Sequence, residues 1–168
     1  MKKMMLTIGL LCAACTWMYA ELNDGKIQES RNRVEKIKVV KSNLESVSTG
    51  EKDVDAVKDA AISVTSEVIQ SGESMAELYE AMNAGKNVLK ECIALSVQLA
   101  NEGLAAADLG QKIEPASKAA KNIKNHKILV NANKLIKNSA EASKLSVEEV
   151  AFEVQVVNEM VEILKAKK

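Results

Sequence analysis

The chain has 168 residues, with 23 basic and 23 acidic side chains and one histidine. This balance does not favour a nucleic-acid partner, because such partners are bound by clusters of Lys and Arg. Aromatic residues make up 2% of the chain, which leaves few side chains for stacking on bases or sugars.

The N-terminal segment, residues 1–20, has the pattern of a bacterial-type secretory signal peptide. Lys2 and Lys3 come before an apolar run, and Ala20 ends the segment just before a polar stretch. We expect cleavage after Ala20 and export of residues 21–168, as a single domain, to the periplasm, the outer membrane or the extracellular space. The apolar run, at about 17 residues, is short for a membrane span, so an uncleaved anchor ranks last.

A second processing route is lipid attachment at Cys15. The segment that ends there resembles a lipobox, although Cys12 stands where a leucine is usual. Trp17, Met18 and Tyr19 would then lie in a tether that is usually polar, so we favour cleavage after Ala20. Lipidation would hold the protein on a membrane without changing the domain that follows.

Cleavage after Ala20 would leave 21 basic and 23 acidic side chains, a net charge of −2. Cys92 would be the only cysteine left, so an internal disulfide is excluded and stability must come from packing. Tyr79 and Phe152 would be the only aromatic residues. The core is therefore expected to consist of Ala, Val, Leu, Ile and Met.

Helical periodicity dominates the first half of the exported chain. A first helix is predicted over residues 25–47, and a second begins at about residue 52. Gly72 interrupts the second helix, and Ser74 with Glu77 forms a capping box for a new one. One long helix through Gly72 is the alternative, because the heptad pattern continues across it. The inward positions expected in these segments are Ile27, Val34, Ile37, Val40, Leu44, Val47, Val54, Val57, Ala61, Val64, Val68, Met75, Leu78, Met82, Leu89, Cys92 and Leu99.

The second half is less regular until its last segment. Residues 101–114 are expected to be the least regular stretch, with one short helix between Gly103 and Gly110 as an open alternative. Pro115 suits the first turn of a following helix that ends near Ser143. Ser146 and Glu149 form a second capping box, which predicts that the last helix begins there. The inward candidates of the two helices are Ile123, Val130, Leu135, Val147, Val150, Val154, Val157, Val161 and Leu164. We therefore predict an all-α fold, an elongated antiparallel bundle of four or five helices with coiled-coil-like stripes.

Candidate chemical groups are few in this sequence. His126 has no second histidine or carboxylate at ligand spacing, so it is interpreted as a surface residue and not a metal ligand. Cys92 lies at an inward heptad position and is interpreted as a buried apolar residue, with a disulfide-linked dimer or a reactive thiol as alternatives. Met75 and Met82 share one stripe and are interpreted as core residues, although methionines can also bind soft metals.

Charge is distributed unevenly along the chain. Residues 51–102 carry ten acids against four lysines, whereas a later helix is rich in lysine. We expect the two segments to pack side by side or to share a solvated surface, and contact with an anionic partner is the alternative. The lysines concerned are Lys118, Lys121, Lys124, Lys127, Lys134, Lys137 and Lys144.

No catalytic, cofactor-binding or metal-binding residues are assigned, and no cofactor is expected. The best interpretation is an envelope-associated or secreted helical protein, not an enzyme, with a structural or adaptor role in binding another envelope protein. The membrane would be involved only through a lipid tether at Cys15. The alternative function is a carrier that holds a small apolar ligand between its helices.

Overall fold

The computed structural model describes the backbone of residues 2–166 and the side chains of residues 24–166. This part of the chain forms four helices and contains no strand. The helices are α1 (Lys2–Glu45), α2 (Lys52–Asn83), α3 (Leu89–Ala120) and α4 (His126–Ala166). The all-α prediction is confirmed, with four helices in the bundle. The predicted signal peptide, residues 1–20, lies outside the residues whose side chains are described, and its cleavage stays a prediction.

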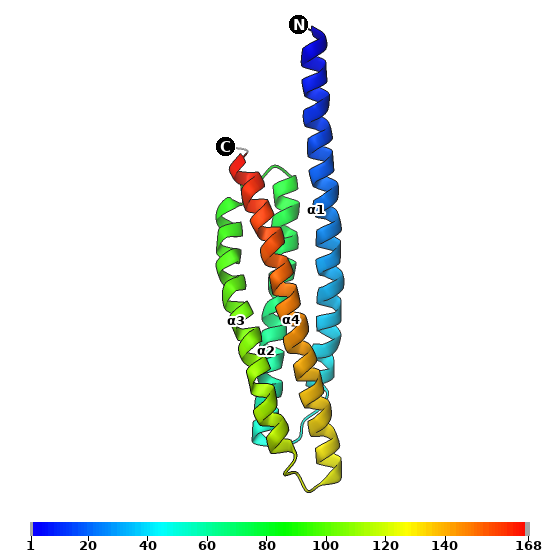
Figure 1. Cartoon of the computed structure of the whole chain (residues 1–168), viewed down its shortest axis with the longest axis vertical. Coiled ribbons are helices and arrows are strands. Elements are labelled where there is room, and N and C mark those ends of the chain that lie inside the picture. The colour runs from blue at the N-terminus through cyan, green and yellow to red at the C-terminus, as the bar shows by residue number, and fades with distance from the viewer. Residues whose placement is uncertain (1, 167–168) are drawn as a thin grey trace.

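The four helices form an elongated up-and-down bundle in which consecutive helices are antiparallel (Figure 1). Helix α1 packs against α2 and α4, and α3 packs against the same two helices. Helices α2 and α4 also contact each other, whereas the described residues of α1 and α3 do not. The bundle therefore has a central α2–α4 pair with α1 along one edge and α3 along the other.

The core follows the apolar stripes along each helix. The predicted stripe of α2, from Val54 to Val68, is buried throughout, and small residues let the helices approach closely. Two predicted inward residues are wrong, since Val147 is 42% exposed and Val130 is 52% exposed. The largest fully buried apolar side chains are Ile37, Leu44, Met75, Leu99, Leu109, Leu135 and Met160.

The first connection lies where the sequence predicted it, since α1 ends at Glu45, α2 begins at Lys52, and Gly50 lies between them with a φ of +73° in the left-handed region that glycine adopts most easily. Helix α2 then runs without a break through Gly72 and Ser74, so the capping box predicted there is wrong and the alternative of a continuous helix is confirmed. The chain turns instead at Gly85, whose φ is +81°. Tertiary burial of the surface around Gly72 outweighs the weak helix propensity of glycine.

In the second half of the chain, the ends of α3 and α4 also differ from the predicted ones. Pro115 lies inside α3 instead of starting a helix, and the expected irregular stretch 101–114 is part of that helix. Helix α4 begins at His126 and runs through Ser146, so the capping box predicted at Ser146 is also wrong. Asn125 is the residue that caps α4, because its Oδ1 accepts hydrogen bonds from the N–H groups of Lys127 at 3.0 Å and Ile128 at 3.3 Å.

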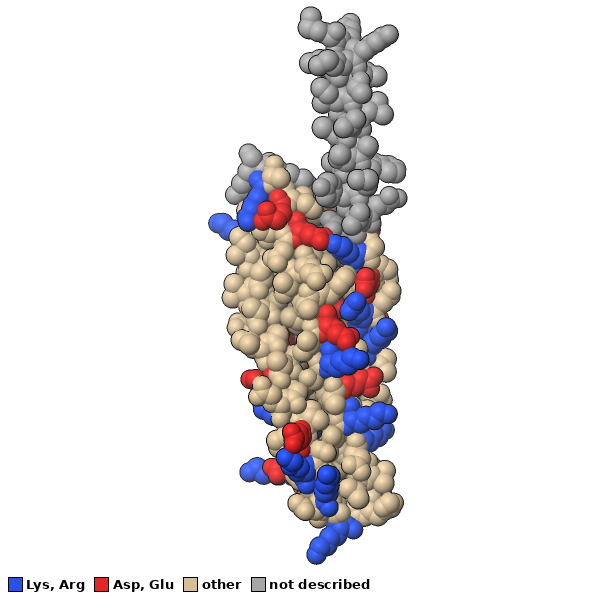
Figure 2. Space-filling model, in the orientation of Figure 1, with Lys and Arg blue, Asp and Glu red and all other residues tan. Residues whose placement is uncertain are grey.

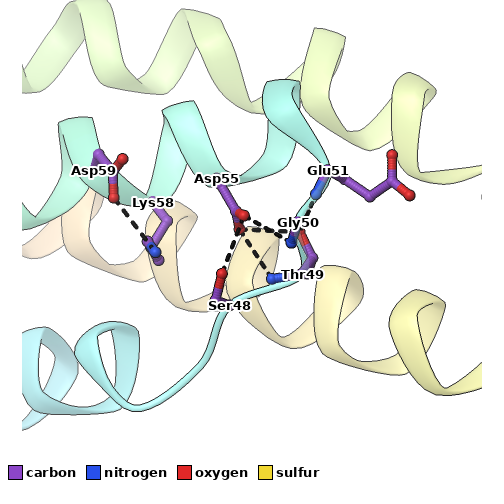
Figure 3. Close-up of polar contacts among 7 residues, drawn as sticks. All are labelled: Ser48, Thr49, Gly50, Glu51, Asp55, Lys58 and Asp59. Atoms are coloured by element: carbon purple, nitrogen blue, oxygen red, sulfur yellow. Dashed lines mark hydrogen bonds and ion pairs between the residues drawn. The ribbon is translucent and has the colours of Figure 1, made fainter.

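Asp55 organises the connection between α1 and α2 (Figure 3). Its carboxylate accepts hydrogen bonds from the N–H groups of Thr49 at 3.1 Å and Gly50 at 2.8 Å. The hydroxyl groups of Ser48 and Thr49 donate to the same carboxylate at 3.1 and 2.9 Å. Burial alone would raise the pKa of Asp55, but these four hydrogen bonds favour the charged form and hold the pKa below its ordinary value.

Candidate functional site

Three glutamate side chains are buried where the four helices meet. Glu149 and Glu153 of α4 have no exposed surface, and Glu102 of α3 is 3% exposed. Charged residues are rarely buried in this way without partners, because removing a carboxylate from water is costly. These three residues, called here the buried carboxyl cluster, are the most unusual chemical feature of the described chain.

Two members of the buried carboxyl cluster have polar partners from other helices. Glu102 accepts hydrogen bonds from Ser71 of α2 at 2.8 Å and from Gln98 of α3 at 2.7 Å. The hydroxyl group of Ser30 in α1 donates to Glu149 Oε1 at 2.5 Å. Arg33 of α1 lies further away, with its Nε atom 3.9 Å from Glu149 Oε2. All four helices therefore contribute to the polar centre of the bundle.

Glu153 has weaker support. The nearby hydroxyl group of Ser71 lowers its pKa, but that hydroxyl donates to Glu102 at 2.8 Å, and neither oxygen of Glu153 nor Oε2 of Glu149 has a hydrogen-bond partner of good geometry among the described residues. Burial outweighs the effect of Ser71 and raises the pKa of Glu153 to about 9, and the nearby carboxyl groups of Glu149 and Glu102 add to the rise. Burial also raises the pKa of Glu149, although Ser30 and Arg33 oppose this shift.

Together, Glu149 and Glu153 satisfy one another by sharing a proton. They are four residues apart on α4, which places their side chains on the same face of the helix. When Glu153 is protonated its O–H group can donate to Glu149, and this contact gives a partner to one oxygen of each residue. Like charges this close do not both ionise readily, so the pair titrates as a unit.

Gly72 makes room for the pair on the facing surface of α2. A Cβ atom at this position would lie 2.8 Å from Cγ2 of Val34 and 3.0 Å from Oε1 of Glu153. The glycine that resembled a helix break is therefore a packing site, where the α2 backbone approaches the carboxyl group closely.

The three carboxyl groups of the buried carboxyl cluster are enclosed by the helices. Among the hollows at the surface are ones with volumes of about 380, 570 and 390 Å³, and none of these is lined by Glu102, Glu149 or Glu153. No group of three or more His, Cys, Asp or Glu side chains between residues 24 and 166 is arranged to hold a metal ion. What the cluster does chemically is to hold a proton inside the core.

Of the candidate residues that the sequence analysis discussed, only one belongs to the buried carboxyl cluster. His126 is exposed at the first position of α4, while Met75 and Met82 are core residues as interpreted. Cys92 is also fully buried, and burial raises the pKa of its thiol. The exception is Glu149, which was interpreted as a capping residue and is instead part of the buried pair.

The lysines of the lysine-rich segment are all exposed. Their ion pairs are local, since Lys118 contacts Glu114 at 2.7 Å and Lys144 contacts Glu148 at 3.9 Å. Within the described residues, no ion pair joins these lysines to the acidic segment 51–102. The expectation of a solvated surface is consistent with this arrangement, and direct pairing of the two segments is not observed.

The two edges of the bundle differ in how many charged side chains they carry. The described part of α1 forms ion pairs within its own helix and across to α2 and α4, such as those of Arg31 with Glu80 at 2.9 Å and Lys26 with Glu159 at 2.5 Å. Figure 2 shows Lys, Arg, Asp and Glu gathered along this edge, next to a broad area over α3 and α4 that has few charged atoms.

The outer surface of α3 carries few charges. Between Glu91 and Asp108 the only charged residue of this helix is Glu102, which is buried. Large apolar side chains are exposed there instead, namely Ile93 at 48%, Val97 at 62% and Leu104 at 68%. With the exposed Ala100 and Ala107 they follow three-and-four spacing along one side of α3, and we call this surface the uncharged face.

Sequence reasoning missed both features for identifiable reasons. The charge-free run from Cys92 to Ala107, apart from Glu102, was visible, but half of it was assigned to an irregular stretch. The convergence of Glu102, Glu149 and Ser30 depends on how the four helices pack, and helix periodicity alone does not reveal it.

Two findings complete the description. None of the helices, over the residues whose side chains are described, has a stretch long and apolar enough to cross a membrane. No family model, curated protein or solved structure matches this chain significantly.

Proposed function

We propose that the protein is exported and acts by binding another protein through the uncharged face, without performing chemistry of its own. The observation that carries this proposal is the exposure of Ile93, Val97 and Leu104 together on one side of α3. Single exposed apolar residues are ordinary, but several on one uncharged surface are typical of protein-binding sites.

The opposite edge of the bundle supports this choice of surface. The charged side chains of α1 have partners within the molecule, including Lys38 with Glu73 at 3.2 Å and Lys41 with Glu45 at 2.7 Å. A partner that docked there would have to replace ion pairs that already exist. At the uncharged face, binding removes apolar surface from water without breaking an ion pair.

Photo-crosslinking from single positions tests this proposal. A photoreactive amino acid is placed at Val97 or Leu104 and the protein is irradiated in the cell that produces it. Val39 of α1 is a matched control, because it is the same residue type as Val97 and both are 62% exposed. We expect a discrete protein adduct from positions 97 and 104 and none from position 39.

Substitutions at the same positions provide the second part of the test. Val97→Lys and Leu104→Lys should abolish the adduct formed from the other position while leaving the unfolding transition unchanged, because both side chains are exposed. Equal adducts from positions 39 and 97, or no protein adduct from any position, would contradict the proposal.

A further inference from the structure

Two charged side chains on α3 define the ends of the uncharged face. Lys90 and Asp108 are eighteen residues apart and both are exposed. Eighteen residues are five turns of an α-helix, so the two side chains lie on the same side of α3, about 27 Å apart. Neither residue forms an ion pair with any described residue of the chain.

The surface between these two charges is uncharged. Around the helix axis, Val97 and Asn101 lie about 20° from the line that joins Lys90 to Asp108, on opposite sides of it, and Leu104 and Ile93 lie about 40° and 60° away on the side of Val97. Read along the helix, this side of α3 has a cation, then an uncharged stretch, then an anion. Its midpoint is at the level of Leu99, which is buried beneath it.

Such a pattern is complementary to itself when it is turned end over end. A two-fold rotation about an axis that passes between the two α3 helices, perpendicular to both at the level of Leu99, brings residue 90 of each copy to the level of residue 108 of the other. It places Lys90 of each copy opposite Asp108 of the other, and it places Val97 opposite Asn101 with Leu104 opposite Ala94. The two ion pairs then flank an uncharged centre, as in a self-complementary interface between identical subunits.

We infer that the partner of the uncharged face is a second copy of this chain, bound with the two α3 helices antiparallel. This inference rests on the proposed function and names its partner. The α1 edge does not offer the same pattern, because Arg31, Lys38 and Lys41 have partners within the chain. The unpaired Lys90 and Asp108 receive partners only when the second copy is present.

The first test measures self-association by sedimentation equilibrium on the purified protein, in the processed form found in the producing cell. Lys90→Glu places two acids opposite each other at both ends of the interface, and Asp108→Lys places two lysines there. Each variant should raise the dissociation constant of the dimer at least about tenfold. Lys36→Glu is the control, since Lys36 is an exposed lysine of α1, and it should leave the constant unchanged.

Mixing the two variants is the decisive measurement. In a heterodimer of Lys90→Glu with Asp108→Lys, the two substituted side chains face each other at one end and form an ion pair of reversed direction. At the other end, the native Asp108 of the first variant pairs with the native Lys90 of the second. The mixture should therefore associate as tightly as the wild type, although each variant alone does not. Failure of the mixture to recover would overturn the antiparallel α3 arrangement.

Two other outcomes separate this inference from the proposed function. A wild-type protein that stays monomeric at about 1 mM, yet still forms the discrete adduct from positions 97 and 104, would contradict the inference that the partner is a second copy of this chain. The proposed function would remain supported. An adduct of twice the chain mass in the producing cell would support both.

Discussion

Glu149 and Glu153 lie one turn apart on α4, and neither carboxyl group has any exposed surface. Ser30 and Arg33 favour the charged form of Glu149, whereas Glu153 faces Gly72 and has no cation beside it. The proton of the pair is therefore held by Glu153, whose pKa is raised to about 9 by burial and by its acidic neighbours.

The first prediction concerns the pH dependence of stability. Between the ordinary glutamate pKa of 4.5 and about 9, the folded chain binds a proton at Glu153 that the unfolded chain releases. The contribution of Glu153 to stability is therefore greatest below its ordinary pKa of 4.5 and falls as pH rises through this window, by at most about 1.4 kcal/mol per pH unit. Glu153→Gln should remove this slope and stabilise the protein by about 1 to 3 kcal/mol at pH 7.

Urea unfolding at pH 5, 7 and 8.5 measures the effect. The other charged groups that face the pair are Arg33 and Glu29 of α1 and Glu102 of α3, and all of them remain in the variant. Glu162→Gln on the exposed side of α4 is the control and should keep the wild-type slope. A wild-type protein whose stability rises steadily from pH 5 to 8.5 would contradict the shared proton.

The second prediction compares two helical glycines. Gly72→Ala should destabilise the bundle by about 1 to 3 kcal/mol, because its Cβ would lie 2.8 Å from Val34 and 3.0 Å from Glu153. Gly103→Ala should stabilise it by about 0.5 to 1 kcal/mol, because its Cβ meets only Val150 at an ordinary 3.5 Å. Thermal unfolding of both variants tests this contrast, and equal shifts in Tm would show that α2 is not tightly packed at Gly72.

The third prediction concerns the first connection. Asp55→Ala removes the acceptor of two backbone N–H groups and two hydroxyl groups, and should cost about 1 to 2 kcal/mol. Because the folded pKa of Asp55 lies below its ordinary value of 3.8, its contribution is present above that pH and is lost as pH falls through the folded pKa. The difference between wild type and variant should therefore shrink below about pH 4, and a constant difference down to pH 2 would contradict the role of the carboxylate.

The fourth prediction is that the thiol of Cys92 is slow to react. Its side chain is fully buried and burial raises its pKa, so both access and the thiolate population are low. A maleimide reagent should label it only as the protein unfolds. In a Cys92→Ala background, Ser63→Cys on the exposed side of α2 should label at the rate of a free thiol. Rapid labelling of native Cys92 would place it outside the core.

The fifth prediction concerns processing of the N-terminus. Intact-mass analysis of the protein from the producing cell should give a chain that begins at Glu21. A chain that begins at Cys15 with added acyl mass would replace cleavage by lipidation, and a chain that retains Lys2 would exclude both routes.

Helical content, most inward positions and the connection between α1 and α2 were predictable, while the later helix ends were not. The stripe from Val54 to Val68 is a local pattern, so periodicity identified it correctly. Gly72 and Ser146 were misread because a glycine or a serine inside a helix has the same local signature as a break or a cap. What keeps α2 continuous at Gly72 is the close approach of Glu153, a contact between distant parts of the chain.

The buried carboxyl cluster shows the limit of local reasoning more directly. Ser146 and Glu149 satisfy the spacing of a capping box, yet Glu149 pairs with Ser30, 119 residues earlier in the chain. The isolation of Glu102, by contrast, is visible in the sequence, because it is the single charged residue between Glu91 and Asp108. Its burial was not, since that depends on Ser71 and Gln98 being placed beside it.

The contact between α1 and α4 joins the beginning of the chain to its end. Lys26 pairs with Glu159 over 133 residues, and Ser30 needs Glu149 of α4 to complete the polar centre. The ribosome releases α1 before α4, so α1 cannot form these contacts until the last helix has been synthesised. The two parts of the polar centre are therefore brought together only at the end of chain synthesis.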